Sequence, residues 1–177
     1  HLVNDIESTG RSSIRLKADG EPAIVALQSS IIAQRPPPRS TIPTNPAAYD
    51  PQANGAIEKG MQDFFVVLRK LLIGLGKRLK ITINSKHPIM EWMVEHAAFV
   101  QTRFNVGHDN KSGHERLGGF KFRGRIVDFG EQVWARLARP QQRGKQKKKL
   151  APRWTQATWV GITQWSGEHK VVIASVR

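Results

Sequence analysis

The sequence contains no cysteine and a single tyrosine, and only 14 of its 177 residues are acidic. Without cysteine there can be no disulfide framework and no thiolate zinc site, and the six histidines lack the paired spacing of a histidine-based metal finger. The apolar runs at 64–68 and 71–75 are separated by Arg69 and Lys70 and are far shorter than the ~20 residues of a membrane-spanning helix. The sequence therefore predicts no membrane segment.

Basic residues are abundant and unevenly distributed. The chain has 28 Lys and Arg residues, a formal net charge of +14 and a pI near 10.8. Residues 119–177 hold 13 basic and 3 acidic side chains, whereas residues 1–118 hold 15 and 11. Six of the basic residues fall within 143–153. The charge predicts a phosphate-rich partner. The basic run at 143–153 is alternatively interpreted as a solvated loop.

The aromatic residues indicate that the basic half is folded. Four of the five tryptophans lie in it, at Trp134, Trp154, Trp159 and Trp165. A disordered basic tail would have few such residues. We interpret the tryptophans as packing residues of the core and of the barrel rim rather than as platforms on which bases stack.

Strands and helices alternate over the first 110 residues. Apolar residues alternate at 12–18, which predicts a strand ending in the Asp19-Gly20 turn. A short β segment is expected at 40–42. Helical periodicity or helix-start residues predict four helices, at 2–10, 22–35, 55–75 and 88–105. We expect Gly74 and Gly76 to end the third of these helices.

The pattern changes after residue 107 to short alternating runs separated by glycine and basic residues. Such runs occur at 133–137, 159–163 and 170–176. The sequence therefore predicts an α/β domain over 1–110, a linker over 111–125 and a small basic all-β module over 126–177.

Two motifs in the first half resemble a known family. The run IRLKADGE at 14–21 resembles the strand and turn that carry the second catalytic aspartate of retrovirus-type and retrotransposon integrases. The run NPAAYDPQANGAIE at 45–58 resembles that family's Pro-Gln, Asn-Gly and Glu signature. Between Asp19 and Glu58 lie 38 residues, close to the spacing for which the family's core is named. Segments 92–105, 114–118 and 129–134 also resemble the end of such a core and its link to a C-terminal barrel.

The resemblance implies a partial ribonuclease-H-like core followed by an SH3-like barrel. It implies that Asp19 and Glu58 are catalytic and hold Mg²⁺ or Mn²⁺, since these hard cations prefer carboxylate oxygens and activate both oxygens of a phosphoryl transfer. It further implies DNA as the partner, DNA integration and recombination by a transposable element, a homo-oligomeric parent protein and a nuclear location. The expected nucleic-acid contacts are Gln52, Asn54, Lys59, Lys147, Lys148 and Lys149.

The chain also departs from the family pattern. The family's first catalytic aspartate lies tens of residues before the second, but only 18 residues precede Asp19. The zinc-binding N-terminal module is absent as well. Because the chain starts at His1, we expect a fragment of a longer protein that lacks one metal ligand and is inactive by itself. Asp5 falls in the expected helix at 2–10, where we interpret it as a surface residue.

Two other readings of the charge remain open. One is a non-catalytic nucleic-acid-binding protein in which the basic β module makes all the contacts and the core is a scaffold. The other is a ribosomal or chromatin structural protein, which would explain the charge but not the strand-end and helix-start positions of Asp19 and Glu58.

Overall fold

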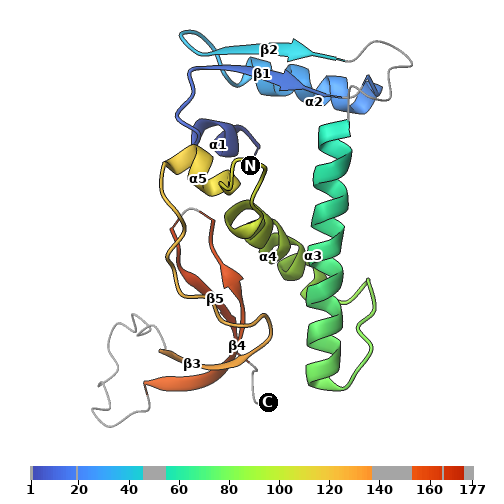
Figure 1. Ribbon diagram of the computed structural model, residues 1–177, viewed down its shortest axis with the longest axis vertical. Helices are drawn as coiled ribbons and strands as arrows, with labels where there is room; N and C mark the ends of the chain where they lie inside the picture. The colour runs from blue at the N-terminus through green and yellow to red at the C-terminus, as the bar shows by residue number, and fades with distance from the viewer. Residues whose placement is uncertain (1, 19, 46–54, 137–152, 165, 174–177) are drawn as a thin grey trace, which may run out of the picture. The chain divides into compact units, whose positions relative to one another are not determined.

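A computed structural model describes residues 2–18, 20–45, 55–136, 153–164 and 166–173 (Figure 1). The chain forms two compact units, 1–62 and 63–177. Several predicted site residues lie outside the described residues, namely Asp19, Gln52, Asn54, Lys147, Lys148 and Lys149. The predicted division into a core ending near 110 and a β module beginning near 126 stays a prediction.

The first unit is built around a β-α-β arrangement. It contains α1 (Leu2–Glu7), β1 (Ser13–Lys17), α2 (Pro22–Ala33), β2 (Ser40–Thr44) and the start of α3 (Gly55–Leu79). β1 and β2 are parallel, and α2 is the crossover between them (Figure 1). Pro22 at the first turn suits the fixed backbone angle of a helix start. β2 ends at Thr44, two residues beyond the predicted end at 42. Pro43 has no backbone N–H to donate, and such a residue is tolerated in a strand at the edge of a sheet.

A buried arginine joins the elements of this unit. The Arg35 side chain is fully buried and donates from Nε to Glu7 Oε1 of α1 at 2.7 Å. Its two terminal nitrogens donate to the Arg11 carbonyl at 3.0 Å, to the Ser40 carbonyl at 3.3 Å and to the Thr41 hydroxyl. One guanidinium thus connects α1, the chain before β1 and the start of β2, which fixes where the parallel pair begins.

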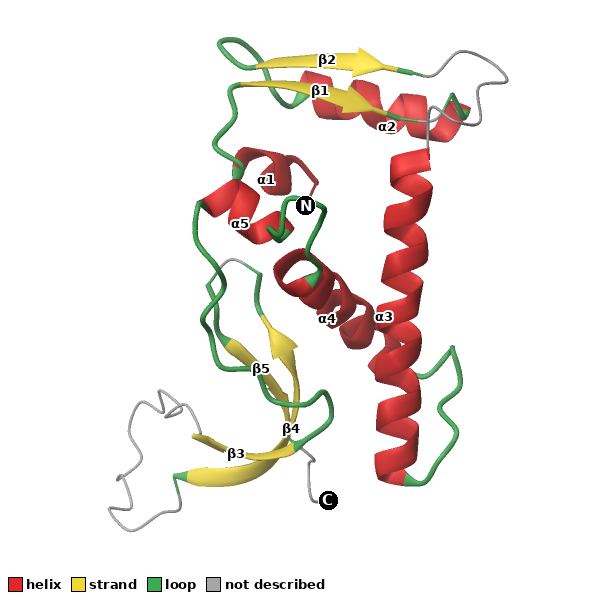
Figure 2. Ribbon diagram, viewed as in Figure 1, coloured by secondary structure: helices red, strands yellow, loops and turns green. Residues whose placement is uncertain are grey.

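The second unit combines helices with a three-stranded sheet. It contains the rest of α3, α4 (Ile89–Phe104), α5 (Gly113–Gly118), β3 (Gln132–Arg136), β4 (Trp154–Ile162) and β5 (His169–Val172) (Figure 2). The sheet is antiparallel in the order β3-β4-β5. In the described residues the five helices and two small sheets confirm the predicted α/β class. None of these described helices is long and apolar enough to span a membrane.

Three elements of the second unit differ from their predictions. β4 begins at Trp154, five residues before the predicted run. Thr155 and Ala157 extend the alternation of less exposed residues, and both pair with residues of β3. β5 begins one residue early, at His169. α5 was not expected, since six residues show no helical period. It forms because the Ser112 hydroxyl accepts a hydrogen bond from the Glu115 amide and Gly119 adopts the left-handed conformation after it.

The end of α3 also differs from its prediction, which placed it at Gly74 or Gly76. The helix continues to Leu79 and ends at Lys80, whose φ of 55° lies in the left-handed region. The Ile81 amide then donates back to the Gly76 carbonyl at 3.1 Å, as at other left-handed helix ends. A Cβ on Gly76 would lie 2.9 Å from the Ile81 carbonyl oxygen. Gly76 therefore does not end the helix, and its missing side chain leaves room for the backbone of Ile81.

Strand β4 supplies side chains to both apolar clusters of the second unit. Val160 packs with Leu75, Met93 and Phe129, while Trp159 and Ile162 pack with Phe99. Trp159 is 1% exposed and its indole N–H donates to His169 Nδ1 at 2.9 Å. The register shift between Trp159 and Gly161 lets neighbouring residues of one strand enter different clusters. These contacts hold α4 against the sheet.

A buried histidine should make the second unit sensitive to acid. His96 is 4% exposed and lies among the rings of Phe99, Phe129 and Trp159, and among the described residues its Nδ1 has no hydrogen-bond partner. Burial lowers the pKa of His96 below its ordinary value. Below pH ~6.5 the unfolded chain therefore binds a proton on His96 more readily than the folded chain does. The contribution of His96 to the free energy of unfolding is thus fully present above that pH and decreases below it.

We expect the urea midpoint of this unit, followed by tryptophan fluorescence, to fall between pH 7.5 and 5.5. His96→Phe should reduce this fall, because phenylalanine fits among the same rings and does not titrate. The exposed His87, changed to Gln, serves as the control. An acid dependence that is the same in His96→Phe as in the unchanged chain would contradict the prediction.

Candidate functional site

The two parallel strands of the first unit end at one edge. Lys17 pairs with Thr44 in the register, and the Ala18 amide donates to the Thr44 carbonyl at 3.2 Å. The two strands therefore end side by side. In the sequence, β1 is followed by Asp19, and β2 is followed by the segment that contains Gln52 and Asn54. In open α/β sheets, ligands bind beyond this carboxyl edge of the strands.

Glu58 lies in the first turn of α3, the helix that follows this edge in the chain. Its side chain and that of Lys59 are exposed. In the part of the chain that the structure describes, no residue holds the Glu58 carboxylate by a hydrogen bond or an ion pair. An acidic residue in the first turn also interacts favourably with the helix dipole. Glu58 is thus available to a cation or a polar ligand.

The structure brings no complete metal site together among its described residues. No group of three or more acidic or histidine side chains in this part of the chain is placed to hold a metal ion. Asp19 lies outside that part, so the expectation that Asp19 and Glu58 face each other stays a prediction. The same holds for the nucleic-acid roles of Gln52, Asn54 and the three consecutive lysines at 147–149.

The outer face of the β3–β4 pair carries two tryptophans whose exposure was not predicted from the sequence. Trp134 is 65% exposed and Trp154 is 55% exposed, whereas Trp159 on the same sheet is buried. The prediction of core packing is therefore confirmed for Trp159 and is wrong for Trp134 and Trp154, whereas packing at a barrel rim stays a prediction. Alternation gave a usable signal, because Trp134 is out of phase with Val133 and Ala135, which face inward.

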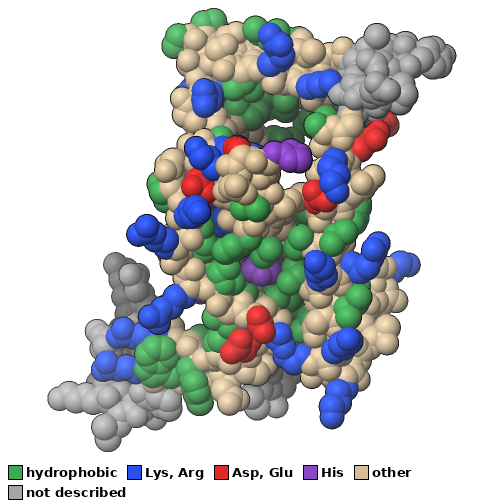
Figure 3. All heavy atoms as spheres, in the orientation of Figure 1, with side chains coloured by type: hydrophobic (Ala, Val, Ile, Leu, Met, Phe, Trp, Pro, Cys, Tyr) green, Lys and Arg blue, Asp and Glu red, His purple; other side chains and the backbone are tan. Residues whose placement is uncertain are grey.

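Basic side chains accompany these exposed rings. Arg136 on β3 and Arg153 just before β4 are exposed, and neither strand contains an acidic residue. Lys and Arg side chains are also spread over the face of the molecule in Figure 3, where acidic side chains are fewer. The surface of the sheet therefore combines flat aromatic rings with positive charge.

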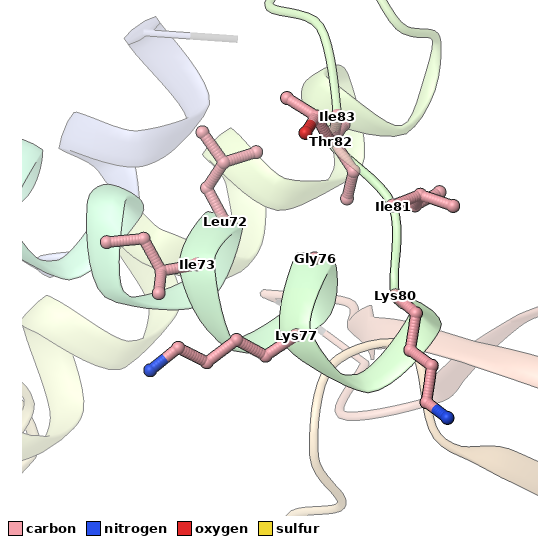
Figure 4. Close-up of a pocket in the computed structure, with 8 residues that line it drawn as sticks. All are labelled: Leu72, Ile73, Gly76, Lys77, Lys80, Ile81, Thr82 and Ile83. Atoms are coloured by element: carbon pink, nitrogen blue, oxygen red, sulfur yellow. The ribbon is translucent and has the colours of Figure 1, made fainter.

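A shallow cavity lies at the C-terminal end of α3, within the second unit (Figure 4). Its volume is about 470 Å³, and its lining is apolar apart from Thr82 and two lysines, Lys77 and Lys80. None of its lining residues is a carboxylate or a histidine. Lys77 and Lys80 are therefore its only titratable lining residues and it offers no carboxylate or imidazole to a metal ion, and it is at the other end of α3 from Glu58.

Comparisons with known proteins give a distant structural likeness. No protein-family model and no curated protein sequence matches this chain. A chain in the cryo-EM structure of the simian T-cell lymphotropic virus intasome in complex with PP2A regulatory subunit B56 gamma matches with a TM-score of 0.48 and 17% identity. The match covers 97% of this chain and 59% of that chain, so this chain spans about three fifths of its length.

Proposed function

We propose that this chain is part of a retrotransposon-type integrase, with a ribonuclease-H-like portion and a small SH3-like β module. The parent protein binds DNA and joins DNA ends by metal-dependent phosphoryl transfer. The proposal rests on the parallel β1–β2 edge of the first unit. Both chain segments that carry the integrase-like motifs leave from that edge, and the helix that follows begins with an exposed glutamate.

In this proposal Asp19 and Glu58 hold Mg²⁺ or Mn²⁺. The residue types fit such an ion, since both offer hard oxygen ligands and the Glu58 carboxylate is exposed in the first turn of α3. When bound, such ions would activate a phosphodiester reaction, one ion acting on the attacking hydroxyl and another on the leaving oxygen. Glu58 orients the ion from a rigid helix, Lys59 next to it adds positive charge for a phosphate, and Gln52 and Asn54 contact the nucleic acid.

A second candidate is a non-catalytic nucleic-acid-binding protein. The observation that favours it is the outer face of β3 and β4, where exposed tryptophans lie beside arginines and no acidic residue belongs to either strand. In that case the first unit is a scaffold, and binding to nucleic acid is independent of any divalent metal ion.

Metal binding separates the two candidates. We expect the full chain to bind Mn²⁺, measured as loss of the free-ion signal in electron paramagnetic resonance. Glu58→Gln should weaken this binding by about tenfold or more, because a ligand is lost from a site with few carboxylates. Asp19→Asn should have a similar effect.

Asp5→Asn is the matched control for this experiment. Asp5 is an exposed carboxylate on α1 of the same unit, so its replacement removes the same charge without touching the proposed site. Equal affinities for the unchanged chain and Glu58→Gln would refute the metal-dependent proposal. An equal loss in Asp5→Asn would show that Mn²⁺ responds only to total charge, and would refute it as well.

A further inference from the structure

The outer face of the β3–β4 pair, which we call the tryptophan face, consists of Gln132, Trp134, Arg136, Trp154 and Gln156. The register pairs Trp134 with Gln156 and Arg136 with Trp154. The two tryptophans are therefore diagonal neighbours on one face of the sheet. Diagonal neighbours lie about 7–8 Å apart, which is close to two nucleotide rises of ~3.4 Å each.

The sheet has a distinct inner face, so the tryptophan face is not part of the core. Val133 packs against the cluster of Phe99, Trp159 and Ile162, and Ala157 is buried. On the outer face the Gln132 amide donates to the Thr158 hydroxyl at 2.9 Å, which places both side chains on that surface. Two large indoles that do not fill the core leave an exposed aromatic surface, and such surfaces mark binding sites.

The charge of this surface selects the kind of partner. Arg136 lies opposite Trp154 in the register and two residues from Trp134 on the same strand, and Arg153 precedes Trp154 in the chain. Residues 119–177 carry 13 basic and only 3 acidic side chains. A phosphate backbone complements this charge, and nucleic-acid bases stack on flat rings. A nucleic acid satisfies both features of the surface at once.

We propose that the tryptophan face binds single-stranded nucleic acid, with unpaired bases stacked on Trp134 and Trp154 and the backbone phosphates near Arg136 and Arg153. Unpaired bases have free faces for an indole, whereas the base faces of a duplex are covered by their neighbours. Gln132 and Gln156 offer amide groups to the base edges without fixing a sequence. This inference rests on the proposed nucleic-acid function of the basic C-terminal half.

The test compares a labelled oligothymidylate with a duplex of equal length, using fluorescence anisotropy and the full chain. The double variant Trp134→Ala with Trp154→Ala should bind the single strand about fivefold or more weakly and the duplex almost unchanged. For this variant, the slope of log K against the logarithm of the salt concentration should equal that of the unchanged chain, because stacking releases no counterions. Trp134→Phe with Trp154→Phe should recover much of the affinity, since a ring is retained.

Two controls separate stacking from other effects. Trp92→Ala removes an exposed indole from α4, outside the tryptophan face, and should leave single-strand binding unchanged. Replacing Lys147, Lys148 and Lys149 by glutamate should weaken binding to both nucleic acids and flatten the salt dependence. If the alanine variant does not fold, quenching of tryptophan fluorescence by oligothymidylate in a background with Trp92→Phe, Trp159→Phe and Trp165→Phe reports on the same face, because Trp134 and Trp154 are then the remaining tryptophans.

The outcomes distinguish this inference from the proposed function. If the unchanged chain binds neither nucleic acid, both are wrong. If it binds duplex while the alanine variant and the unchanged chain bind single strands equally, only the tryptophan face is wrong. A variant that loses self-association in light scattering, with single-strand affinity unchanged, would assign the face to a second copy of this chain and overturn the inference.

Discussion

Replacing Arg35 by methionine is expected to lower the free energy of unfolding of the first unit by about 3–5 kcal/mol. The guanidinium is fully buried, pairs with Glu7 and donates to three further oxygens. Methionine has a similar length but donates no hydrogen bond, so the three part-buried oxygens of Arg11, Ser40 and Thr41 lose this donor. Hydrogen exchange of the full chain should show the loss at the amides of Ala18 and Ser40, which join the two strands.

Arg39 provides the matched control, because it binds the same carboxylate from an exposed position. Its Nε lies 2.8 Å from Glu7 Oε2 and its side chain is 50% exposed. Solvent screens such a pair, so Arg39→Gln should cost under about 1 kcal/mol. Equal effects of the two substitutions would show that burial of Arg35 contributes nothing to the stability of the parallel pair. A large effect of Arg35→Met should also weaken Mn²⁺ binding, since the proposed site lies where the same two strands end.

Replacing Trp159 by alanine is expected to lower the free energy of unfolding of the second unit by about 3–5 kcal/mol. Its ring is buried against Phe99 and Ile162, lies edge-on to His96 and donates a hydrogen bond to His169. Alanine leaves a cavity between α4 and the sheet, and it leaves His169 without its donor. Urea unfolding followed by far-UV circular dichroism, together with hydrogen exchange of β4, measures the loss.

Trp134→Ala is the control for this substitution, because it removes the same side chain from the opposite face of the sheet. Trp134 is 65% exposed, so its loss should cost under about 1 kcal/mol, mostly from cross-strand contact. A similar cost for both tryptophans would mean that the inner and outer faces are not as distinct as the structure indicates. A small cost for Trp134→Ala also ensures that its binding defect reports on stacking.

The proposed functions use different units of the chain. The integrase-like motifs belong to the unit 1–62, whereas the tryptophan face and the excess of positive charge belong to 63–177. Substitutions at Glu58 should therefore change metal binding without changing single-strand binding. Substitutions at Trp134 and Trp154 should do the reverse.

Local patterns in the sequence were sufficient to predict most elements. The alternation at 12–18 and the apolar periodicity of the helices at 22–35 and 88–105 identified β1, α2 and α4, because each period reflects one buried face. The position of Glu58 at a helix start followed from its distance to Asn54 and Gly55. The sequence alone also determined the positive charge and the absence of thiol chemistry, since both are sums over composition.

Only the tertiary structure decided which surfaces are buried. Trp134 and Trp159 are the same residue type in neighbouring strands of one sheet. Alternation separates the two faces of each strand but does not say which of them α4 covers. Arg35 likewise looks like an ordinary surface arginine at a helix end. It is buried because α1 and β2, distant in sequence, supply acceptors around it. Burial depends on contacts between segments far apart in the chain, whereas helix and strand periods depend on neighbouring residues.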